Sequence, residues 1–266
     1  PGRAQAGHFG RVSETESAIA PTAPDLRLGV AICTLNEEQA LPRLLARLVD
    51  AGDAHDRADL VVVADGGSQD HTVSLARERG ATVLECGRGR GLQLRAAGEG
   101  LLAAEVDVLL FLHADSLPRL GALRALREAF GALDGPFVEA AAMTQVIDDP
   151  DRVFRWIERA ANARARRGMV YGDSGLAVRA EAYRAVGGFR SVPLFEDVDL
   201  SKRLRGRTKI HVVEDAVLVI SARRWHKEGV LRCTTRNWIL RGLFECGVPP
   251  AALELLYRPP SGRRAP

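Results

Sequence analysis

Lysine is scarce in this sequence. It occurs only as Lys202, Lys209 and Lys227, so arginine supplies nearly all of the 37 basic residues. Acidic residues almost balance them, and the formal net charge at pH 7 is only +3. This balance gives no strong electrostatic case for binding nucleic acid. We attribute most of the arginine to codon usage, and the arginine at particular positions to phosphate binding, which suits the two-pronged guanidinium group.

Cysteine is also rare, and its spacing excludes some kinds of site. Cys33, Cys86, Cys233 and Cys246 include no CxxC pair. A zinc site or a thiol redox site is therefore not indicated. We expect the four cysteines to be small core residues of a protein in a reducing compartment.

Long apolar runs are missing as well. No run approaches the roughly 20 residues that a transmembrane helix needs, and the N-terminal residues lack the charged start and apolar core of a signal peptide. An initiator methionine is also missing, as in a trimmed or incomplete chain. With 266 residues, 46% of them hydrophobic, we expect a soluble cytoplasmic protein of one large domain or two small ones.

Two glycine-rich phosphate-binding patterns are absent. No GxGxxG follows a strand in the Rossmann position, and there is no GxxxxGK[ST]. Residues 88–91, Arg-Gly-Arg-Gly, offer arginine side chains, including Arg90, and a flexible backbone to an anion, although the pattern is weak. A nucleotide would therefore have to be bound in another way.

A buried strand that ends in polar residues is the central feature of what is present. Residues 108–112 form an unbroken apolar run, typical of a parallel strand covered on both faces. His113, Ala114 and Asp115 follow, and we expect Pro118 to stop the strand. Ligands gather beyond the carboxyl ends of strands in open α/β sheets. Asp115 is placed to hold a divalent metal under a diphosphate, or else only to cap the next helix.

The first half of the chain alternates strands and helices. The pattern predicts strands at 28–34, 60–64, 81–85 and 108–112, a helix after residue 36, and helices at 72–79 and 88–103. This alternation predicts a parallel sheet wound with helices. The second half is predicted to have helices at 120–130, 151–167, 180–186, 196–205 and 232–246, with strands at 137–146, 210–213 and 217–220. Residues 1–25 and 258–266 are predicted to be disordered.

Polar residues also follow the first two strands. Thr34-Leu-Asn-Glu-Glu38 follows the first, where Asn36 could cap the next helix, and Asp65-Gly66-Gly67 follows the second. A carboxylate at such a strand end can accept hydrogen bonds from a nucleobase or ribose, and the glycines let backbone approach a ligand. The alternative is a glycine-rich turn in which Asp65 only caps a helix.

Acidic residues gather at one predicted helix start. Residues 194–200 include Glu196, Asp197 and Asp199. One of them could be a general base facing an acceptor hydroxyl. The alternative is that they only complement the helix dipole.

A basic and aromatic group follows the last predicted strand. Residues 221–226 combine two arginines, a tryptophan and a histidine: Arg223, Arg224, Trp225 and His226. Such a group could hold a diphosphate and complete a metal shell. The alternative is a solvated basic loop with a buried tryptophan.

In this order, these groups resemble the family 2 glycosyltransferases, which have the GT-A nucleotide-sugar-binding fold. The resemblance runs from about Leu26 to Tyr257. It is carried by Thr34-Leu-Asn-Glu37, Asp65-Gly-Gly-Ser-Gln-Asp70, His113-Ala-Asp115, Glu196-Asp197 and Arg223-Arg-Trp-His226. The phrases Phe-Leu-His-Ala-Asp and Ser-Ala-Arg-Arg-Trp are similar to a bacterial subgroup named for its association with radical-SAM and selenodomain proteins. The resemblance implies one GT-A domain over 26–257, with a nucleotide-binding half of about 26–118 and an acceptor half of about 119–257.

The resemblance also implies roles for single residues. Asp115 matches the last acid of the family's metal-binding Asp-x-Asp, His113 stands where the family has the first acid, and His226 could supply a further metal ligand. Asp197 matches the family's base, with Glu196 beside it, and the acceptor-side loop holds Gly172 and Asp173. The nucleotide sugar would be bound by Arg90 and by a set of residues at the strand ends and after the last strand. This set is Thr34, Leu35, Asn36, Glu37, Asp65 (reading the base), Gly66, His113, Ala114, Arg223, Arg224 and Trp225.

The implied reaction moves a sugar from a UDP- or GDP-sugar to a hydroxyl acceptor, with inversion at the anomeric carbon. Mg²⁺ or Mn²⁺ and arginines would neutralise the leaving diphosphate, and Asp197 would take the proton of the acceptor. Two alternatives stay open. A sugar nucleotidyltransferase would want a glycine-rich basic loop directly after the first strand, which this chain lacks. A non-catalytic nucleotide-sugar-binding protein would explain the missing first acid of the metal motif.

A lipid-linked acceptor is compatible with the resemblance. Residues 151–167 form a basic amphipathic helix that could rest on an anionic membrane, at the inner face of the membrane. The alternative is a core-packed helix with a solvated basic face. We expect at most peripheral membrane contact and no nucleic-acid partner.

Overall fold

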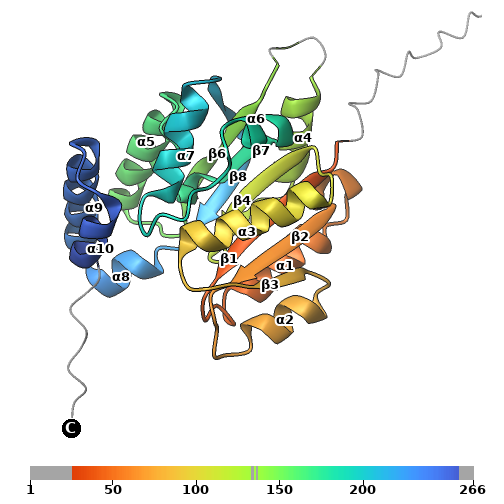
Figure 1. Ribbon diagram of the computed structural model, residues 1–266, viewed down its shortest axis with the longest axis horizontal. Helices are drawn as coiled ribbons and strands as arrows, with labels where there is room; N and C mark the ends of the chain where they lie inside the picture. The colour runs from red at the N-terminus through yellow and green to blue at the C-terminus, as the bar shows by residue number, and fades with distance from the viewer. Residues whose placement is uncertain (1–25, 133–134, 136, 258–266) are drawn as a thin grey trace, which may run out of the picture.

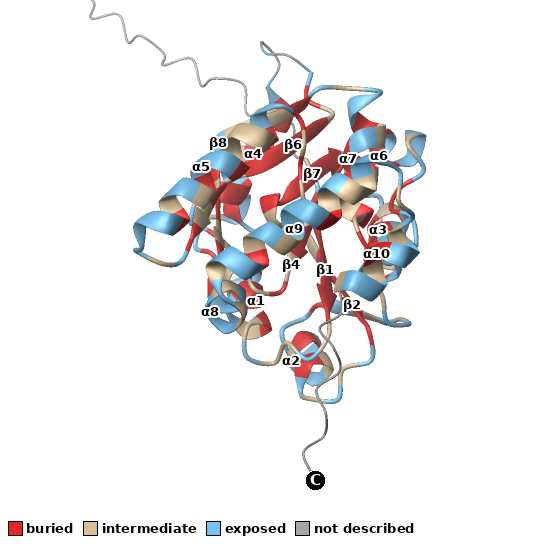
Figure 2. Ribbon diagram, turned by 90° about the vertical axis from the view of Figure 1, so that its left-hand side faces the viewer, coloured by how far each residue is buried: buried red, intermediate tan, exposed pale blue. Residues whose placement is uncertain are grey.

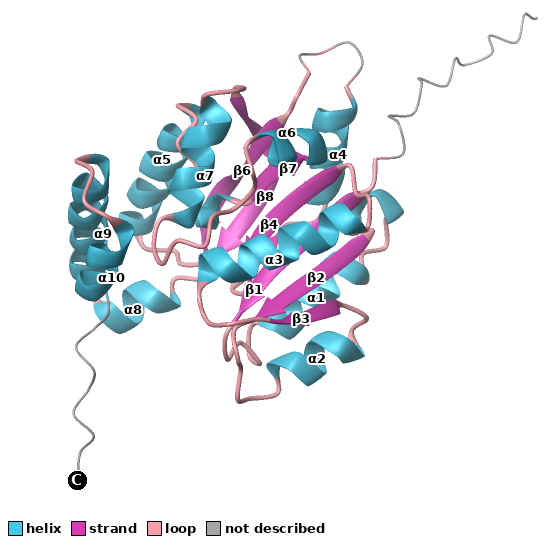
Figure 3. Cartoon of the chain, viewed as in Figure 1, coloured by secondary structure: helices cyan, strands magenta, loops and turns pink. Residues whose placement is uncertain are grey.

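One mixed eight-stranded sheet runs through the computed structural model, which describes residues 26–132, 135 and 137–257 (Figure 1). The strand order is β3-β2-β1-β4-β7-β6-β8-β5. Helices cover both faces of the sheet (Figure 3), which confirms the predicted α/β architecture. The segments 1–25 and 258–266, both predicted to be disordered, lie outside the described residues.

The first half of the chain builds the parallel part of the sheet. In order, its elements are β1 (Leu28–Thr34), α1 (Leu41–Val49), η1 (Ala54–Asp56), β2 (Leu60–Asp65), α2 (Thr72–Glu78), β3 (Thr82–Glu85), α3 (Arg90–Ala103) and β4 (Val108–His113). β1 pairs in parallel with both β2 and β4, and β2 with β3. The predicted alternation of strands and helices is confirmed.

The second half extends the sheet beyond β4. Its elements are β5 (Ser116–Pro118), α4 (Ala122–Gly131), β6 (Ala140–Ile147), α5 (Arg152–Arg166), η2 (Gly172–Ser174), β7 (Leu176–Arg179), α6 (Ala180–Ala185), α7 (Glu196–Arg205), β8 (Ile210–Ile220), α8 (Arg223–Glu228), α9 (Val230–Glu245) and α10 (Pro250–Tyr257). β7 is antiparallel to β4 and β6, whereas β6 and β8 are parallel. β5 closes the edge, antiparallel to β8.

Three strand predictions for the second half are corrected. β7 was not predicted, and the two strands predicted at 210–213 and 217–220 are the single strand β8. The exposed Glu214 and Asp215 interrupt its apolar pattern without ending it, and the pairing with β6 shifts there, between Met143 and Thr144. Pro118 is not the residue that ends β4, because β4 ends at His113 and Pro118 is the last residue of the separate strand β5. β5 is the edge strand, where a residue without an N–H removes no ladder hydrogen bond.

The C-terminal region is more helical than predicted. Residues 223–228, for which a solvated basic loop was one alternative, form α8, and α10 was not predicted. α8 buries none of its residues, so it has no apolar stripe that a sequence pattern could reveal. α9 begins at Val230, two residues before the predicted start.

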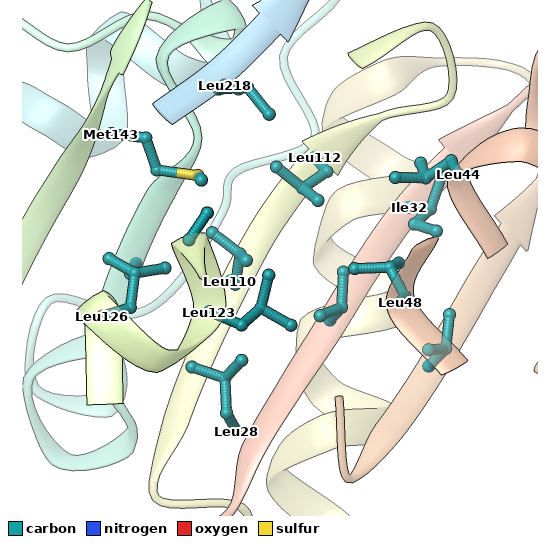
Figure 4. Close-up of a cluster of buried hydrophobic side chains, with 14 of the residues drawn as sticks. Leu28, Ile32, Leu44, Leu48, Leu110, Leu112, Leu123, Leu126, Met143 and Leu218 are labelled. Atoms are coloured by element: carbon teal, nitrogen blue, oxygen red, sulfur yellow. The ribbon is translucent and has the colours of Figure 1, made fainter. Parts of the chain in front are cut away.

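The core lies on both faces of the sheet. On one face, leucines of α1 and α4 pack on β1 and β4 (Figure 4). Leu44, Leu48 and Leu123 are at most 1% exposed. Burying a leucine side chain contributes about 1.5–3 kcal/mol. On the other face, α3, α6 and α7 cover the sheet through side chains such as Leu101 and Leu204.

Burial of the four cysteines departs from the prediction at one position. All four are free; Cys33 and Cys233 are buried and Cys86 is partly buried. Cys246, at the end of α9, is exposed, so the expectation of a core position is wrong for it. None of the helices described between 26 and 257 is long and apolar enough to cross a membrane.

Candidate active site

The carboxyl ends of β1, β2 and β4 meet at one edge of the sheet. Thr34 lies opposite Asp65, and Cys33 lies opposite His113. These strands are buried because they are central, and the chain becomes polar where each strand leaves the core. The polar residues predicted to share this edge are thus brought together, as expected for parallel strands.

Asp65 is the anchor of the loop that follows β2. It is only 2% exposed. Its carboxylate accepts hydrogen bonds from Thr34 Oγ1 (2.9 Å), Gly67 N (2.9 Å), Ser68 N (2.7 Å) and Ser68 Oγ (2.5 Å). Burial alone would raise the pKa of Asp65, but these hydrogen bonds lower it overall. Both oxygens of Asp65 therefore shape the loop, and its contact with a base stays a prediction.

Asn36 joins the loops that follow β1 and β2. Its backbone N–H donates to Ser68 Oγ (2.8 Å), and its side-chain oxygen accepts from Gln69 N (2.8 Å). Its φ of 54° lies in the left-handed region, where asparagine is among the residues best tolerated. The predicted helix cap is therefore wrong: α1 is preceded by Ala40 without a side-chain cap, because Asn36 is used across the loops.

Gln93 is a site residue that the sequence did not reveal. It is buried in the first turn of α3, and its Nε2 donates to the carbonyls of Thr34 (2.7 Å) and Ala64 (2.9 Å). One side chain thereby satisfies backbone groups of both β1 and β2 near their ends. The only available signal was its position one helical turn after Arg90.

Arg90, in the same turn of α3, connects the strand-end loops with the start of α7. Its Nε lies 3.1 Å from Glu196 Oε1, and its Nη2 lies 2.8 Å from His113 Nε2. A guanidinium group can only donate, so His113 Nε2 must accept and Nδ1 must carry the ring proton. Nδ1 in turn lies 3.8 Å from Cys33 Sγ. Burial and the neighbouring Arg90 hold the pKa of His113 well below its usual value, so the ring is neutral.

Asp197 is held at the start of α7 by two backbone donors. Oδ2 accepts from Gly172 N (2.5 Å) and Oδ1 from Val198 N (2.7 Å). Burial raises the pKa of both Asp197 and its neighbour Glu196, and Arg90 partly offsets this. A cavity of about 10 Å³, lined in part by His113, Gly172 and Asp197, lies beside this carboxylate. It has room for about one water-sized group.

Two backbone features occur where the side chains of Arg90, His113 and Asp197 come together. Phe195, which precedes Glu196, has a φ of 62°, a conformation that costs a non-glycine residue free energy and is concentrated at functional sites. A side chain added at Gly172 would meet the side chains of His113, Arg90 and Asp197. Gly172 therefore permits the three side chains to converge on its backbone.

Arg223 approaches the strand-end loops from the other half of the chain. Its Nη2 lies 3.3 Å from Glu37 Oε2 and 3.9 Å from Asp115 Oδ2. Asp115 does not cap α4, whose N-cap is Gly121. Its side chain is 37% exposed and that of Glu37 is 23% exposed, so Asp115 is the carboxylate more open to a cation at this point.

The other residues of α8 are engaged elsewhere. Arg224 stacks on the ring of Tyr257 (5.0 Å), and Trp225 packs edge-on against Phe154 (5.6 Å). His226 Nε2 lies 2.7 Å from Asp149 Oδ2. Its role as a metal ligand stays a prediction, and it has a different partner in this structure.

The carboxylates near Arg223, those of Glu37 and Asp115, fit a divalent metal that is bound partly by the substrate. Among residues 26–132, 135 and 137–257, no group of three or more His, Cys, Asp and Glu side chains could form a protein cage for a metal. Mg²⁺ is usually bound by one or two carboxylates together with substrate phosphates and waters. Asp115, open to solvent and close to Glu37 through Arg223, suits that mode.

Cations also gather beside Gly172. Arg164 and Arg241 lie over the ring of Tyr171 at 3.7 and 4.6 Å, and Arg164 Nη2 is 4.0 Å from Asp173 Oδ1. Arg164 Nε and Nη2 are buried without a hydrogen-bond partner. Sequence patterns did not single out Tyr171 or these arginines, because they belong to three separate elements.

A family model agrees with this geometry. The model described as "Glycosyl transferase family 2" matches residues 29–179, which cover β1 to β7 and most of the site. A search of the curated proteins finds no match.

Solved structures of similar fold are glycosyltransferases. A mannosyltransferase from Pyrobaculum calidifontis, in complex with GDP-Man and Mn²⁺, is 24% identical with a TM-score of 0.55 over 76% of this chain and 59% of its own. Glucosyl-3-phosphoglycerate synthase from Mycobacterium tuberculosis, with Mg²⁺ and UDP, is 20% identical with a TM-score of 0.58 over 85% and 81%. S. aureus TarS 1-349 with UDP-GlcNAc is 17% identical with a TM-score of 0.58 over 74% and 58%. The chain thus spans less than two thirds of the first and third of these.

Proposed function

The chain belongs to glycosyl transferase family 2 and is a glycosyltransferase of the GT-A fold, and from this premise we propose that it moves a sugar from a UDP- or GDP-sugar to a hydroxyl acceptor with inversion. Within the family we propose the radical-SAM/selenodomain-associated subgroup, supported by the phrases around His113 and Arg223. We also propose one catalytic domain over 26–257, with its nucleotide-binding half before residue 119.

The observation that carries the proposal is the environment of Asp197. Its carboxylate is fixed by Gly172 N and Val198 N, and it lines a small cavity together with His113 and Gly172. Burial raises its pKa, which makes the ionised form a stronger base. Asp197 would accept the proton of the acceptor hydroxyl as that oxygen attacks the anomeric carbon. A single base and attack opposite the leaving group give inversion.

Arg90 and Glu196 support this base. Arg90 places positive charge near Asp197 and Glu196, which favours their ionised forms against the effect of burial. His113 fixes the orientation of Arg90 by accepting from Nη2. Arg90, held by Glu196 and His113, would therefore help to keep Asp197 ionised before the acceptor enters.

The donor would lie over the strand-end loops. Arg223 is close enough to the loop carboxylates to neutralise charge on a leaving diphosphate. Asp115, with Glu37 nearby, would hold Mg²⁺ or Mn²⁺, which supplies further charge neutralisation of the diphosphate when bound. The solved relatives with GDP-Man and Mn²⁺ and with UDP and Mg²⁺ support this choice of donors and metals.

The acceptor would enter beside the loop of Gly172 and Asp173. The partner-free nitrogen atoms of Arg164 are next to this loop. A buried donor without a partner is costly, so an acceptor carrying an anionic group, such as a lipid-linked phosphate, would gain binding energy here.

A thermal-shift panel tests the donor site. UDP, GDP, CDP, dTDP and their sugars are compared with Mg²⁺, Mn²⁺ or EDTA, because a ligand of the folded state raises the melting temperature. We expect one nucleotide to give a metal-dependent shift that is lost in Asp115→Asn and kept in Asp50→Asn, a surface acid outside the site. No shift with any nucleotide, from folded protein, would remove the donor-binding site.

A further inference from the structure

The outward face of α9 exposes three large apolar side chains. Leu231, Trp238 and Ile239 are 77%, 61% and 63% exposed. Their spacing of seven and eight residues puts them on one side of the helix, together with Thr235 and Gly242. A helix at the surface of a soluble domain normally presents charged residues on that side.

α10 repeats the pattern beside it. Leu255 and Leu256 are 76% and 63% exposed. The opposite sides of both helices are already used, because Leu240 and Leu253 are buried against Leu194. Figure 2 shows α9 and α10 on the same face of the molecule. These residues, Leu231, Trp238, Ile239, Leu255 and Leu256, are called the hairpin surface, an apolar surface that no other residue of the described ranges covers.

Exposed basic residues occur in the segment that carries the hairpin surface. Between 223 and 257 the chain has six basic and three acidic residues. Two of the acids are neutralised within the fold, Glu228 by Arg236 and Glu245 by Lys202. The basic residues exposed without an ion pair among the described residues include Lys227 and Arg232.

We propose that the hairpin surface docks on an anionic lipid bilayer, with its leucines and Trp238 in the interface and the neighbouring arginine and lysine side chains at the lipid headgroups. Exposed leucines with an amphipathic tryptophan and a basic rim are the combination by which interfacial helices bind anionic membranes. The inference goes beyond the proposed function, since it concerns lipid binding without any donor or acceptor.

The proposed docking surface differs from the helix that the sequence suggested for membrane contact. α5, the basic helix predicted to touch the membrane, packs on β6 and buries Phe154 and Ala161. It exposes Trp156 and Val153 among arginines, but its apolar stripe belongs to the core. Val230, at the start of α9, packs near Phe154, so α5 flanks the hairpin surface without forming it.

Docking would bring the candidate active site to the lipid surface. The inner side of the hairpin contacts Leu194 and Phe195, which directly precede Glu196 and Asp197. Arg241 of α9 also stacks on Tyr171, next to Gly172. A membrane-embedded hydroxyl or phosphate-bearing acceptor could then reach Asp197 while its tail stays in the bilayer.

Vesicle sedimentation of the full chain tests the proposal. Vesicles of phosphatidylcholine with 30% phosphatidylglycerol are compared with pure phosphatidylcholine, at low and high salt, without nucleotide. We expect binding to the anionic vesicles only, weakened by salt. The double variant Leu231→Ser, Trp238→Ser should reduce vesicle binding at least tenfold. The double variant Lys227→Gln, Arg232→Gln should reduce vesicle binding by roughly fivefold for each charge removed.

Matched controls separate docking from loss of structure. Leu120→Ser changes a leucine that is 81% exposed outside the hairpin surface, and Arg43→Gln changes an exposed charge on α1. Both should bind vesicles as the unchanged chain does, and all variants should keep its melting temperature. Absence of vesicle binding overturns the proposal. So does a dimer in light scattering that Leu231→Ser with Trp238→Ser converts to monomer, since a second copy would then be the occupant.

Discussion

Arg90 Nη2 donates a hydrogen bond to His113 Nε2 across 2.8 Å, and this contact fixes which ring nitrogen of His113 carries the proton. His113 occupies the position where the resemblance led us to expect a metal-binding acid. Its ring nitrogen is instead directed at a guanidinium group that also pairs with Glu196.

Replacing His113 should therefore affect catalysis through Arg90. We expect His113→Leu to lower kcat by about 10- to 100-fold, since Arg90 loses the acceptor that orients it. His113→Gln keeps an acceptor and should recover much of that loss. The KM for metal should be similar in both variants. A large increase in metal KM, with kcat maintained, would instead make His113 a metal ligand.

Asp197→Asn should fold and transfer almost no sugar. Removing a general base typically lowers kcat by about 10²- to 10⁴-fold. In the unchanged chain, burial raises the pKa of Asp197, so activity should fall as pH falls through a value above the usual 3.8. The rate is measured from pH 4 to 8 at saturating donor. Near-normal transfer by Asp197→Asn would exclude it as the base.

Gly172→Ala should damage activity more than stability. A methyl group here meets His113, Arg90 and Asp197. We expect a loss of about 1–3 kcal/mol in the free energy of unfolding and a much larger relative loss of kcat. Gly52→Ala is the control, because nothing lies within 4 Å of a side chain added there. Equal behaviour of the two variants in denaturant and in the assay would contradict the packing argument.

The loop of Asp65 should loosen in acid. Its folded-state pKa is lowered, so its carboxylate stabilises the fold above the unfolded value of about 3.8, and the contribution is lost as pH falls below that value. Thr34→Val removes one donor to Asp65 and should cost about 1 kcal/mol at pH 7. The difference between Thr34→Val and the unchanged chain should shrink at pH 3. A difference independent of pH would mean that the hydroxyl acts elsewhere.

Metal removal should weaken donor binding without unfolding the protein. Asp115 is partly open to solvent, and its ion-pair partner within the described part of the chain is Arg223 at 3.9 Å, so we expect the fold not to depend on a metal there. EDTA should leave the melting temperature of the free protein unchanged and raise the dissociation constant for the nucleotide. Arg223→Gln should raise it further, because one positive charge near the diphosphate is lost. A melting temperature that drops in EDTA alone would indicate a structural metal.

The predicted part of the fold was the part encoded in uninterrupted apolar runs. β1, β2 and β4 were found because central parallel strands are buried on both faces, and their ends placed Thr34, Asp65 and Asp115 at one edge. β7 was not predicted because it has only four residues, and these are a strand through their pairing with β4 and β6, which no local pattern reveals. α8 was missed because it buries nothing.

The partners inside the site were harder to predict than its position. Arg90 and Glu196 are distant in sequence and meet only through tertiary packing. Asn36 was interpreted as a helix cap, which is the local use of its side chain, while the fold uses it to bind Gln69 of another loop. Motifs identify residue types at strand ends, whereas long-range geometry decides which of them touch.

The first turn of α3 has a mechanical consequence. Gln93 holds the backbone ends of β1 and β2, and Arg90, three residues earlier on the same turn, holds Glu196 and His113. A helical turn is stiff, so we expect Gln93 and Arg90 to move together. A small shift of the loops after β1 and β2 would therefore also shift Arg90, and with it the contact between Arg90 and Glu196 at the start of α7.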